Sequence, residues 1–237
     1  MKALILAAGR GERMRPLTDS TPKPLLVVRG KPLIEWHLES LARAGIRDIV
    51  INTAWLEEQF PAALGDGSRW GLSIRYSMEG RDHGGALETA GGIKKALPLL
   101  VDAPSDCFWY VAADVFAPAF AFDPQAVARL AASERLAHLW LVPNPPHVAG
   151  GDFGIHAGLA TLGAEGKRFT WSAIGLFRAA FVNELLNDLA PGIKARLRPY
   201  LDRAIAARRL GAELYAGEWA DVGTPQRLAA LDASASA

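Results

Sequence analysis

A short apolar run at the start of the chain leads directly into a glycine-bearing segment. Residues 2–7 have the composition of a buried β-strand, and residues 8–16 follow without a spacer. Gly9 and Gly11 carry no Cβ, so the backbone N–H groups of this turn can approach an anion closely. The segment therefore predicts a strand that ends in a phosphate-binding loop.

Positively charged side chains at Arg13, Arg15 and Lys23 follow the glycines. The segment is not a Walker A loop, because no Gly-Lys-Ser/Thr sequence follows at the required distance. It matches the dinucleotide-binding fingerprint only in part, since Met14 stands where the third glycine would pack and Pro16 would interrupt a helix starting there. Two glycines after a strand are weak evidence alone, and the added cations favour anion binding. A dinucleotide-dependent oxidoreductase stays an alternative.

The same segment resembles the signature of the sugar-1-phosphate nucleotidyltransferases. The shared pattern is Leu6-Ala-Ala-Gly-x-Gly-x-Arg-x-x-Pro-Leu-Thr18, followed by Pro22-Lys-Pro-Leu25. Within this family the chain is most similar to members that join UTP to N-acetylmuramate α-1-phosphate in cell-wall recycling, on the evidence of residues 51–55, 64–68, 87–92 and 219–224. The resemblance covers nearly the whole chain.

Strand-like and helix-like patterns alternate through the first half. Strands are expected at residues 2–7, 48–52, 72–77, 108–113 and 137–142, with helices at 32–44, 55–64, 87–100 and 124–134. This alternation predicts an α/β fold with parallel strands and crossover helices. The resemblance implies a Rossmann-like, mostly parallel sheet flanked by helices, the nucleotide-diphospho-sugar transferase fold of GT-A type, with a small mixed acceptor-binding lobe.

The regular alternation of strand-like and helix-like patterns ends at the proline-rich segment 143–146. We interpret residues 1–142 as a nucleotide-binding core, 143–218 as the mixed lobe that binds the acceptor, and 219–237 as a segment with a metal ligand and a C-terminal helix. At 237 residues the chain can bury roughly 70% of its unfolded surface, enough for one core. A single domain over 1–237 is therefore expected.

Two aspartates stand at positions suited to holding a metal ion. Asp114 ends a buried strand, and Asp221 lies in a short strand-to-loop segment. Ligands of open parallel sheets bind beyond the carboxyl ends of the strands, where Asp114 would face the glycine loop. Mg²⁺ prefers one or two carboxylates together with phosphate oxygens and water. The residues alone leave turn or helix-cap roles equally open, whereas the resemblance implies that both aspartates bind Mg²⁺.

The resemblance also implies the reaction and its participants. An oxygen of a sugar-1-phosphate attacks the α-phosphorus of a nucleoside triphosphate, and pyrophosphate departs. Arg13 and the backbone of Ala8, Gly9 and Gly11 would hold the triphosphate, while Lys23 would neutralise the α-phosphate and the incoming phosphate. No side-chain nucleophile is required, because a phosphate oxygen is already ionised.

A second glycine-rich segment, residues 79–92, precedes a helix. The resemblance implies that it lines the base and ribose, with Glu79 and Gly91 contacting the nucleotide. An ionised Glu79 only accepts hydrogen bonds, which suits the imide N–H of uracil and also the N–H groups of guanine. It therefore does not select the nucleotide. His83-Gly-Gly85 lengthens the loop relative to the related pattern, and we interpret it as a flexible surface insertion.

Three segments of the second half resemble the acceptor-binding region of the family, and they imply that Asn144, Asp152 and Ser172 contact the sugar. The family usually shows Gly where Ala173 stands, and Asn-Gly where this chain has Ala112-Ala113. The acceptor therefore stays open, and so do mannose-1-phosphate guanylyl transfer and glucose-1-phosphate uridylyl or thymidylyl transfer.

Composition argues against nucleic acid and membranes as partners, while the small-molecule substrates are what the resemblance implies. A net charge of +1, from 26 basic and 25 acidic residues, gives no global field favouring nucleic acid or a membrane. The single Cys107 suits a reducing cytoplasm, and neither a signal peptide nor a membrane span is expected. A monomer and a homodimer both stay open. A catalytically silent sugar-nucleotide sensor is the alternative of another class, disfavoured because Arg13, Lys23, Asp114 and Asp221 are all present.

Overall fold

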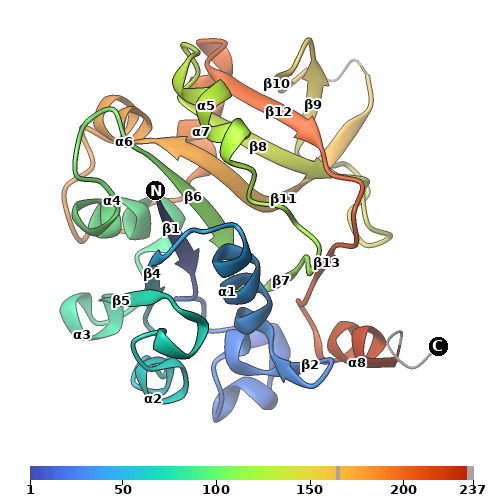
Figure 1. The fold of residues 1–237 in the computed structure, drawn as a ribbon. Coiled ribbons are helices and arrows are strands. Elements are labelled where there is room, and N and C mark those ends of the chain that lie inside the picture. The colour runs from blue at the N-terminus through green and yellow to red at the C-terminus, as the bar shows by residue number, and fades with distance from the viewer. Residues whose placement is uncertain (164–165, 234–237) are drawn as a thin grey trace.

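A nine-stranded sheet runs through the computed structural model, which describes residues 1–163 and 166–233 (Figure 1). The last four residues of the expected C-terminal segment, 234–237, lie outside the described residues. The strands of the sheet, in spatial order, are β5 (Ser73–Met78), β4 (Asp48–Thr53), β1 (Lys2–Leu6), β6 (Cys107–Ala112), β11 (Arg168–Arg178), β8 (Ala137–Val142), β12 (Leu210–Leu214), β10 (Leu159–Thr161) and β9 (Phe153–His156).

Most strands of the sheet point the same way. β5, β4, β1 and β6 are parallel neighbours. β11 is antiparallel to both β6 and β8, and β12 is parallel to β8, so β8 and β12 share the direction of β6. β9 is antiparallel to β11 and so shares this direction too. The carboxyl ends of seven strands therefore lie on one side of the sheet, where ligands of such folds bind.

Helices cover both faces of this sheet (Figure 1). The cluster on one face includes residues of α1 (Leu33–Arg43), α2 (Gln59–Leu64) and α5 (Pro124–Ala131). The cluster on the other face includes residues of α4 (Glu88–Leu100), α6 (Ala179–Leu185) and α7 (Arg198–Ala206). Ile5 belongs to the first cluster and Leu4 to the second, as the period-two geometry of a strand requires. The expected α/β fold is confirmed.

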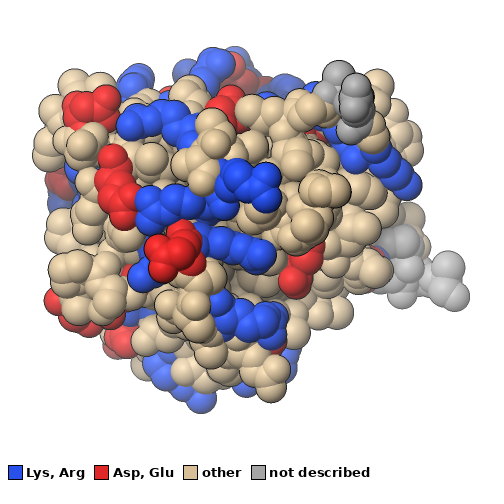
Figure 2. Space-filling model, turned by 90° about the horizontal axis from the view of Figure 1, so that it is seen from above, with Lys and Arg blue, Asp and Glu red and all other residues tan. Residues whose placement is uncertain are grey.

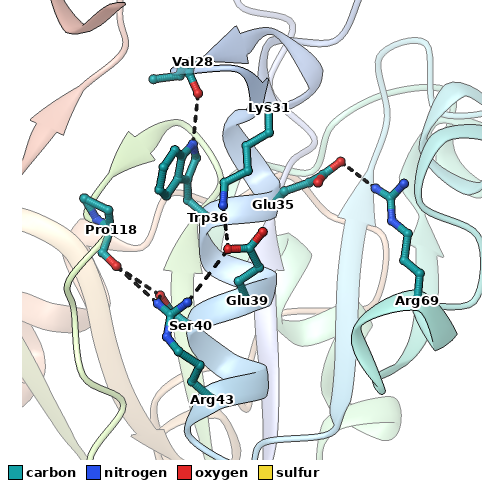
Figure 3. Close-up of polar contacts among 9 residues, drawn as sticks. All are labelled: Val28, Lys31, Glu35, Trp36, Glu39, Ser40, Arg43, Arg69 and Pro118. Carbon is teal, nitrogen blue, oxygen red and sulfur yellow. Dashed lines mark hydrogen bonds and ion pairs between the residues drawn. The ribbon is translucent and has the colours of Figure 1, made fainter. Parts of the chain in front are cut away.

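Helix α1 shows how its sequence separates a buried from a polar side. Its apolar stripe includes Leu38 and Leu41, both fully buried. The polar side carries the ion pairs Lys31–Glu39 and Arg69–Glu35, at 2.5 Å each, and the Trp36 indole N–H donates to Val28 (Figure 3). These contacts tie α1 to the β-hairpin before it and to the 3₁₀ helix η4 (Ser68–Trp70).

His37 lies on the buried side of α1 and packs there. Its Nε2 stands 2.8 Å from the carbonyl oxygen of Val115, so the neutral ring donates there. Burial lowers the pKa of His37 from 6.5 to about 4. The contact fixes α1 to β7 (Val115–Phe116), the strand that follows Asp114.

Several short elements complete the edge where the site lies. β7 pairs with β13 (Ala220–Asp221), and β2 (Val27–Val28) pairs with β3 (Lys31–Pro32). The 3₁₀ helices η1 (Glu12–Met14), η2 (Leu17–Asp19) and η3 (Lys23–Leu25) follow β1. The helix α3 (Glu79–His83) follows β5, and α8 (Pro225–Ala233) follows β13 near β2 (Figure 1).

The second half of the chain is not a separate sheet. Residues 143–218, expected to form an acceptor lobe, contribute β11 and β12 to the central sheet, and β11 inserts between β6 and β8. β11 is eleven residues long, and residues on both of its faces are buried. β12 was not expected, since its Gly211 weakens the strand pattern. α2 begins at Gln59 rather than at residue 55.

The surface carries charges of both signs. Seen from above Figure 1, basic side chains gather toward the middle of the face with acidic side chains beside them (Figure 2). In residues 1–163 and 166–233, no helix combines the length and the apolar character that crossing a membrane requires.

Candidate active site

A cavity of about 400 Å³ opens at the carboxyl edge of the sheet. Its wall is built by the loop after β1, the ends of β4 and β6, the start of α4, and Lys23. A volume of this size is in the range of small-molecule sites. The cavity therefore lies where both glycine-bearing segments were expected to converge.

The loop after β1 combines a fixed turn with an open approach. Gly11 has φ +68°, and its carbonyl oxygen accepts hydrogen bonds from the Met14 N–H at 2.8 Å and the Thr18 hydroxyl at 2.9 Å. A Cβ at Gly11 would lie 3.0 Å from the Thr18 side chain, whereas a Cβ at Gly9 would meet no heavy atom within 4 Å. Gly11 holds the turn, and Gly9 leaves room for a ligand. Ala8, Gly9 and Gly11 all line the cavity.

Met14 explains why this loop departs from the dinucleotide-binding fingerprint. Its side chain is fully buried in a small cluster with Phe116 and Val222, among others. Phe116 belongs to β7, and Val222 follows β13 directly. The side chain that replaces the third glycine thus packs the loop against the strand pair β7–β13, which contains Asp221 and directly follows Asp114.

Lys23 and Asp114 form an ion pair on the cavity wall. The distance from Lys23 Nζ to Asp114 Oδ2 is 2.6 Å, and the lysine side chain is only 11% exposed. Pro22 and Pro24 flank this lysine at the start of η3. The structure therefore brings together the expected catalytic cation and one expected metal ligand.

Asp221 lies on the strand beside Asp114, since the Val222 N–H donates to the Asp114 carbonyl oxygen at 2.9 Å. One Asp221 oxygen is 3.0 Å from His147 Nε2, and the other accepts from Arg227. Neither contact was expected, because His147 and Asp221 approach only through the fold.

The two aspartates suit an ion that takes further ligands from a substrate. No group of three or more His, Cys, Asp or Glu side chains within residues 1–163 and 166–233 could hold a metal by itself. Two carboxylates on paired strands fit Mg²⁺, which completes its coordination with phosphate oxygens and water. Arg13 is exposed, and its Nη2 lies 3.5 Å from the Cβ position of Gly223, near this pair.

Glu79 is fully buried beneath the cavity. One of its oxygens accepts from the Asn52 side chain and the other from the Leu87 N–H, both at 2.7 Å. Asn52 in turn accepts from the Ala7 N–H at 2.8 Å. Burial raises the pKa of Glu79, and the two hydrogen bonds oppose this shift. Glu79 thus ties three cavity loops together, and its contact with a base stays a prediction.

Gly91 packs against a different segment of the chain. Its N–H donates to the carbonyl oxygen of Ala195 at 3.3 Å, and a Cβ would lie 2.5 Å from the carbonyl oxygen of Ile193. Close packing accounts for this glycine, and it does not contribute to the cavity wall. Nucleotide contact by Gly91 stays a prediction that this position does not support.

The three expected sugar contacts gather around a bulge in β11. Asn144 donates to the Arg168 carbonyl and accepts from Thr170, and Asp152 accepts from the Trp171 N–H at 2.8 Å. Ser172 is fully buried and donates to the Trp140 carbonyl at 2.7 Å. None of the three lines the cavity, so sugar contact stays a prediction.

The register shift between Trp171 and Ile174 makes the bulge, and Ala173 within it has φ +59°. This left-handed conformation explains why glycine would suit the position.

Arg10 is a further residue of the cavity, and the sequence pattern did not single it out. It lines the cavity, and its guanidinium carbon lies 4.4 Å from the centroid of the Trp55 ring. The Trp55 indole N–H donates to the Thr18 carbonyl oxygen at 2.9 Å, so the platform under Arg10 is fixed. Its position between Gly9 and Gly11 is the sequence feature that could have indicated a place in the cavity.

Comparison with known proteins agrees with this geometry. The family model described as nucleotidyl transferase matches residues 2–155. The chain is 47% identical to N-acetylmuramate alpha-1-phosphate uridylyltransferase of Neisseria meningitidis serogroup B, over 100% of this chain and 99% of that protein. It is 40% identical to a protein of the same name from Caulobacter vibrioides, over 52% of this chain and 53% of that protein.

A solved structure shares the fold. This Bacillus anthracis protein, provisionally named a glucose-1-phosphate thymidylyltransferase and solved in complex with a sucrose, superposes with a TM-score of 0.82 at 22% identity. The match covers 99% of this chain and 95% of that chain, so it extends over the whole sheet.

Proposed function

The chain belongs to the nucleotidyl transferase family, and on that premise we propose that it transfers the uridylyl group of UTP to N-acetylmuramate α-1-phosphate. A phosphate oxygen of the sugar-1-phosphate forms a bond to the α-phosphorus of UTP. The bond from that phosphorus to the β-phosphate oxygen breaks, and pyrophosphate leaves with the electron pair. The substrates follow from the full-length relative whose name specifies them.

The observation that carries the chemistry is the Lys23–Asp114 pair on the wall of the cavity, beside the glycine loop. Lys23 delivers a fixed positive charge where the α-phosphate would lie, and little reorganisation is needed because its side chain is already packed. The open approach at Gly9 lets backbone N–H groups meet the triphosphate. Arg10 and Arg13 add charge near the mouth of the site. Catalysis is then mainly positioning and neutralisation.

Asp114 and Asp221 would hold Mg²⁺, which when bound neutralises phosphate oxygens and orients the triphosphate. Before the metal arrives, each aspartate is paired with a cation of the chain, namely Lys23 and Arg227.

We further propose that the enzyme works in the cytoplasm and returns a cell-wall sugar to nucleotide-linked form. UTP is a cytoplasmic substrate. Cys107 is a free, buried thiol whose pKa is raised by burial, which suits a reducing compartment.

The test is pyrophosphate release in a matrix of nucleotides and sugar phosphates. UTP, dTTP, GTP, CTP and ATP are each combined with muramate-, glucosamine-, glucose- and mannose-1-phosphates, with Mg²⁺ and with excess chelator. We expect one dominant signal from UTP and N-acetylmuramate 1-phosphate, which the chelator abolishes. A different dominant pair would overturn the substrate assignment, and release that persists in the chelator would overturn the metal assignment.

A further inference from the structure

Glu88 combines two features that the proposed reaction does not yet use. It is exposed, and it lines the cavity next to Ala86 and Thr89. Within residues 1–163 and 166–233, its carboxylate has neither an ion-pair nor a hydrogen-bond partner. An acidic group on a cavity wall with no partner in the protein is available to a ligand.

The backbone of Glu88 has an unusual conformation. Its φ is +62°, a value in the left-handed region that side chains other than glycine rarely adopt. Glycine would occupy this position without strain. Strained residues persist only where the surroundings enforce them, and they cluster at functional sites.

The surroundings of Glu88 do enforce this conformation. The Leu87 N–H donates to Glu79 at 2.7 Å, and the Leu87 carbonyl accepts from the Ala195 N–H at 3.0 Å. On the other side, the Ala90 N–H donates to the Ala195 carbonyl at 2.8 Å. Glu88 is therefore held between two pinned residues, and the start of its side chain has a fixed direction.

Glu79, another carboxylate of this segment, cannot take the same role without rearrangement. Glu79 is fully buried, and each of its oxygens accepts a hydrogen bond from the protein. Of the two, only Glu88 reaches the cavity wall. A carboxylate accepts hydrogen bonds only and repels phosphate, so its partner is a neutral donor.

We propose that Glu88 is a specificity-determining residue whose carboxylate accepts a hydrogen bond from the nucleoside part of the triphosphate. This inference rests on the proposed function and deepens it. The donors that a uridine offers are the imide N3–H of the base and the two ribose hydroxyls. All three share the chemistry that Glu88 requires, and nucleotide analogues separate them.

The test is a double-mutant cycle between Glu88 and the nucleotide. Dissociation constants of UTP, N3-methyl-UTP, 2′-deoxy-UTP and 3′-deoxy-UTP are measured by calorimetry with Mg²⁺, for the wild type, Glu88→Ala and Glu88→Gly. We expect the wild type to bind one analogue about tenfold more weakly than UTP. In both variants the dissociation constants of that analogue and of UTP should agree within about twofold. The analogue concerned identifies the donor. Glu88→Gln keeps an acceptor oxygen and should restore part of the discrimination.

Thermal unfolding separates recognition from a structural role. Glu88→Gly removes strain and should raise Tm while it weakens UTP binding, two effects that a purely structural residue would not combine. Arg208 is the matched control, because it also has a positive φ, +56°, after α7 and away from the cavity. Arg208→Gly should raise Tm and leave UTP binding unchanged.

The inference is overturned if, for each of the three analogues, the ratio of its dissociation constant to that of UTP is the same in the wild type and in the Glu88 variants. The binding cycle needs no acceptor, so it is independent of turnover. Failure of the proposed function would instead appear as wild-type protein that binds UTP and releases no pyrophosphate with any sugar phosphate.

Discussion

The cavity beside the glycine loop and the bulge of β11 differ in whether their polar side chains line an open cavity. In the cavity, Lys23, Asp114 and Glu88 all reach the wall, and the approach to Gly9 is open. At the bulge, Asn144, Asp152 and Ser172 all bind other parts of the protein. On the proposed assignment, the nucleotide half of the site is preformed, whereas the three side chains expected at the acceptor are engaged within the protein.

The largest effect is expected from removing the cation of the preformed half. Lys23→Ala should lower kcat/KM at least about a hundredfold, or about 2.7 kcal/mol, because Asp114 and the α-phosphate both lose their positive partner. Steady-state kinetics measure the loss, and circular dichroism should show an intact fold. Asp114→Asn should behave alike. A near-normal rate in either variant would remove the mechanism.

The buried frame of the nucleotide half should make the protein sensitive to acid. The folded pKa of His37 is about 4, below its ordinary value of 6.5, so the unfolded chain binds the extra proton between these values. The contribution of the neutral His37 to the free energy of unfolding is therefore fully present above pH 6.5. The free energy of unfolding should fall by roughly 2 kcal/mol between pH 7 and pH 5. Denaturant titrations at both pH values measure this. His37→Gln should reduce the dependence of the free energy of unfolding on pH. An unchanged dependence in that variant would mean that another group causes it.

The bulge should respond through stability rather than through sugar recognition. Ser172→Ala removes a hydroxyl that donates to Trp140 and accepts from the Ile174 N–H. We expect a loss of about 1 kcal/mol in the free energy of unfolding and a change in the KM of the sugar phosphate below about twofold. A large rise in that KM at unchanged Tm would make Ser172 a direct contact of the sugar phosphate. It would contradict the contrast drawn between the cavity and the bulge.

The smallest effect is expected at Arg15, a cation of the signature that does not line the cavity. It pairs with Asp19 at 2.7 Å, and its side chain is 60% exposed. Exposed pairs of this kind contribute below about 1 kcal/mol. Arg15→Ala should therefore keep kcat/KM within about twofold. A loss comparable to that of Lys23→Ala would bring Arg15 into the site.

The sequence brought the glycine loop and Lys23 to one cavity correctly, because these signals are local. Gly9, Gly11 and Lys23 lie within one segment, and the turn they form depends on backbone freedom and charge that can be seen in the sequence. Asp114 could be placed because the end of a buried strand has a known position in such sheets.

The remaining features depend on contacts between distant segments. The insertion of β11 between β6 and β8 is a matter of strand order, which periodicity does not encode. Glu79 is buried whereas Glu88 lines the cavity, although both carboxylates belong to the same glycine-rich segment. The sequence does not show this difference. The contact of His147 with Asp221 joins loops that no spacing relates.

Titration calorimetry on the free protein tests the central contrast most directly. The ligands are a UTP analogue with an imido group between its α- and β-phosphates, which prevents transfer, and N-acetylmuramate 1-phosphate, each with Mg²⁺. We predict that the UTP analogue binds the free protein, and that the sugar phosphate binds only after the nucleotide site is filled. Binding of the sugar phosphate to the free protein as tightly as the UTP analogue would contradict a preformed nucleotide half beside an unformed acceptor half.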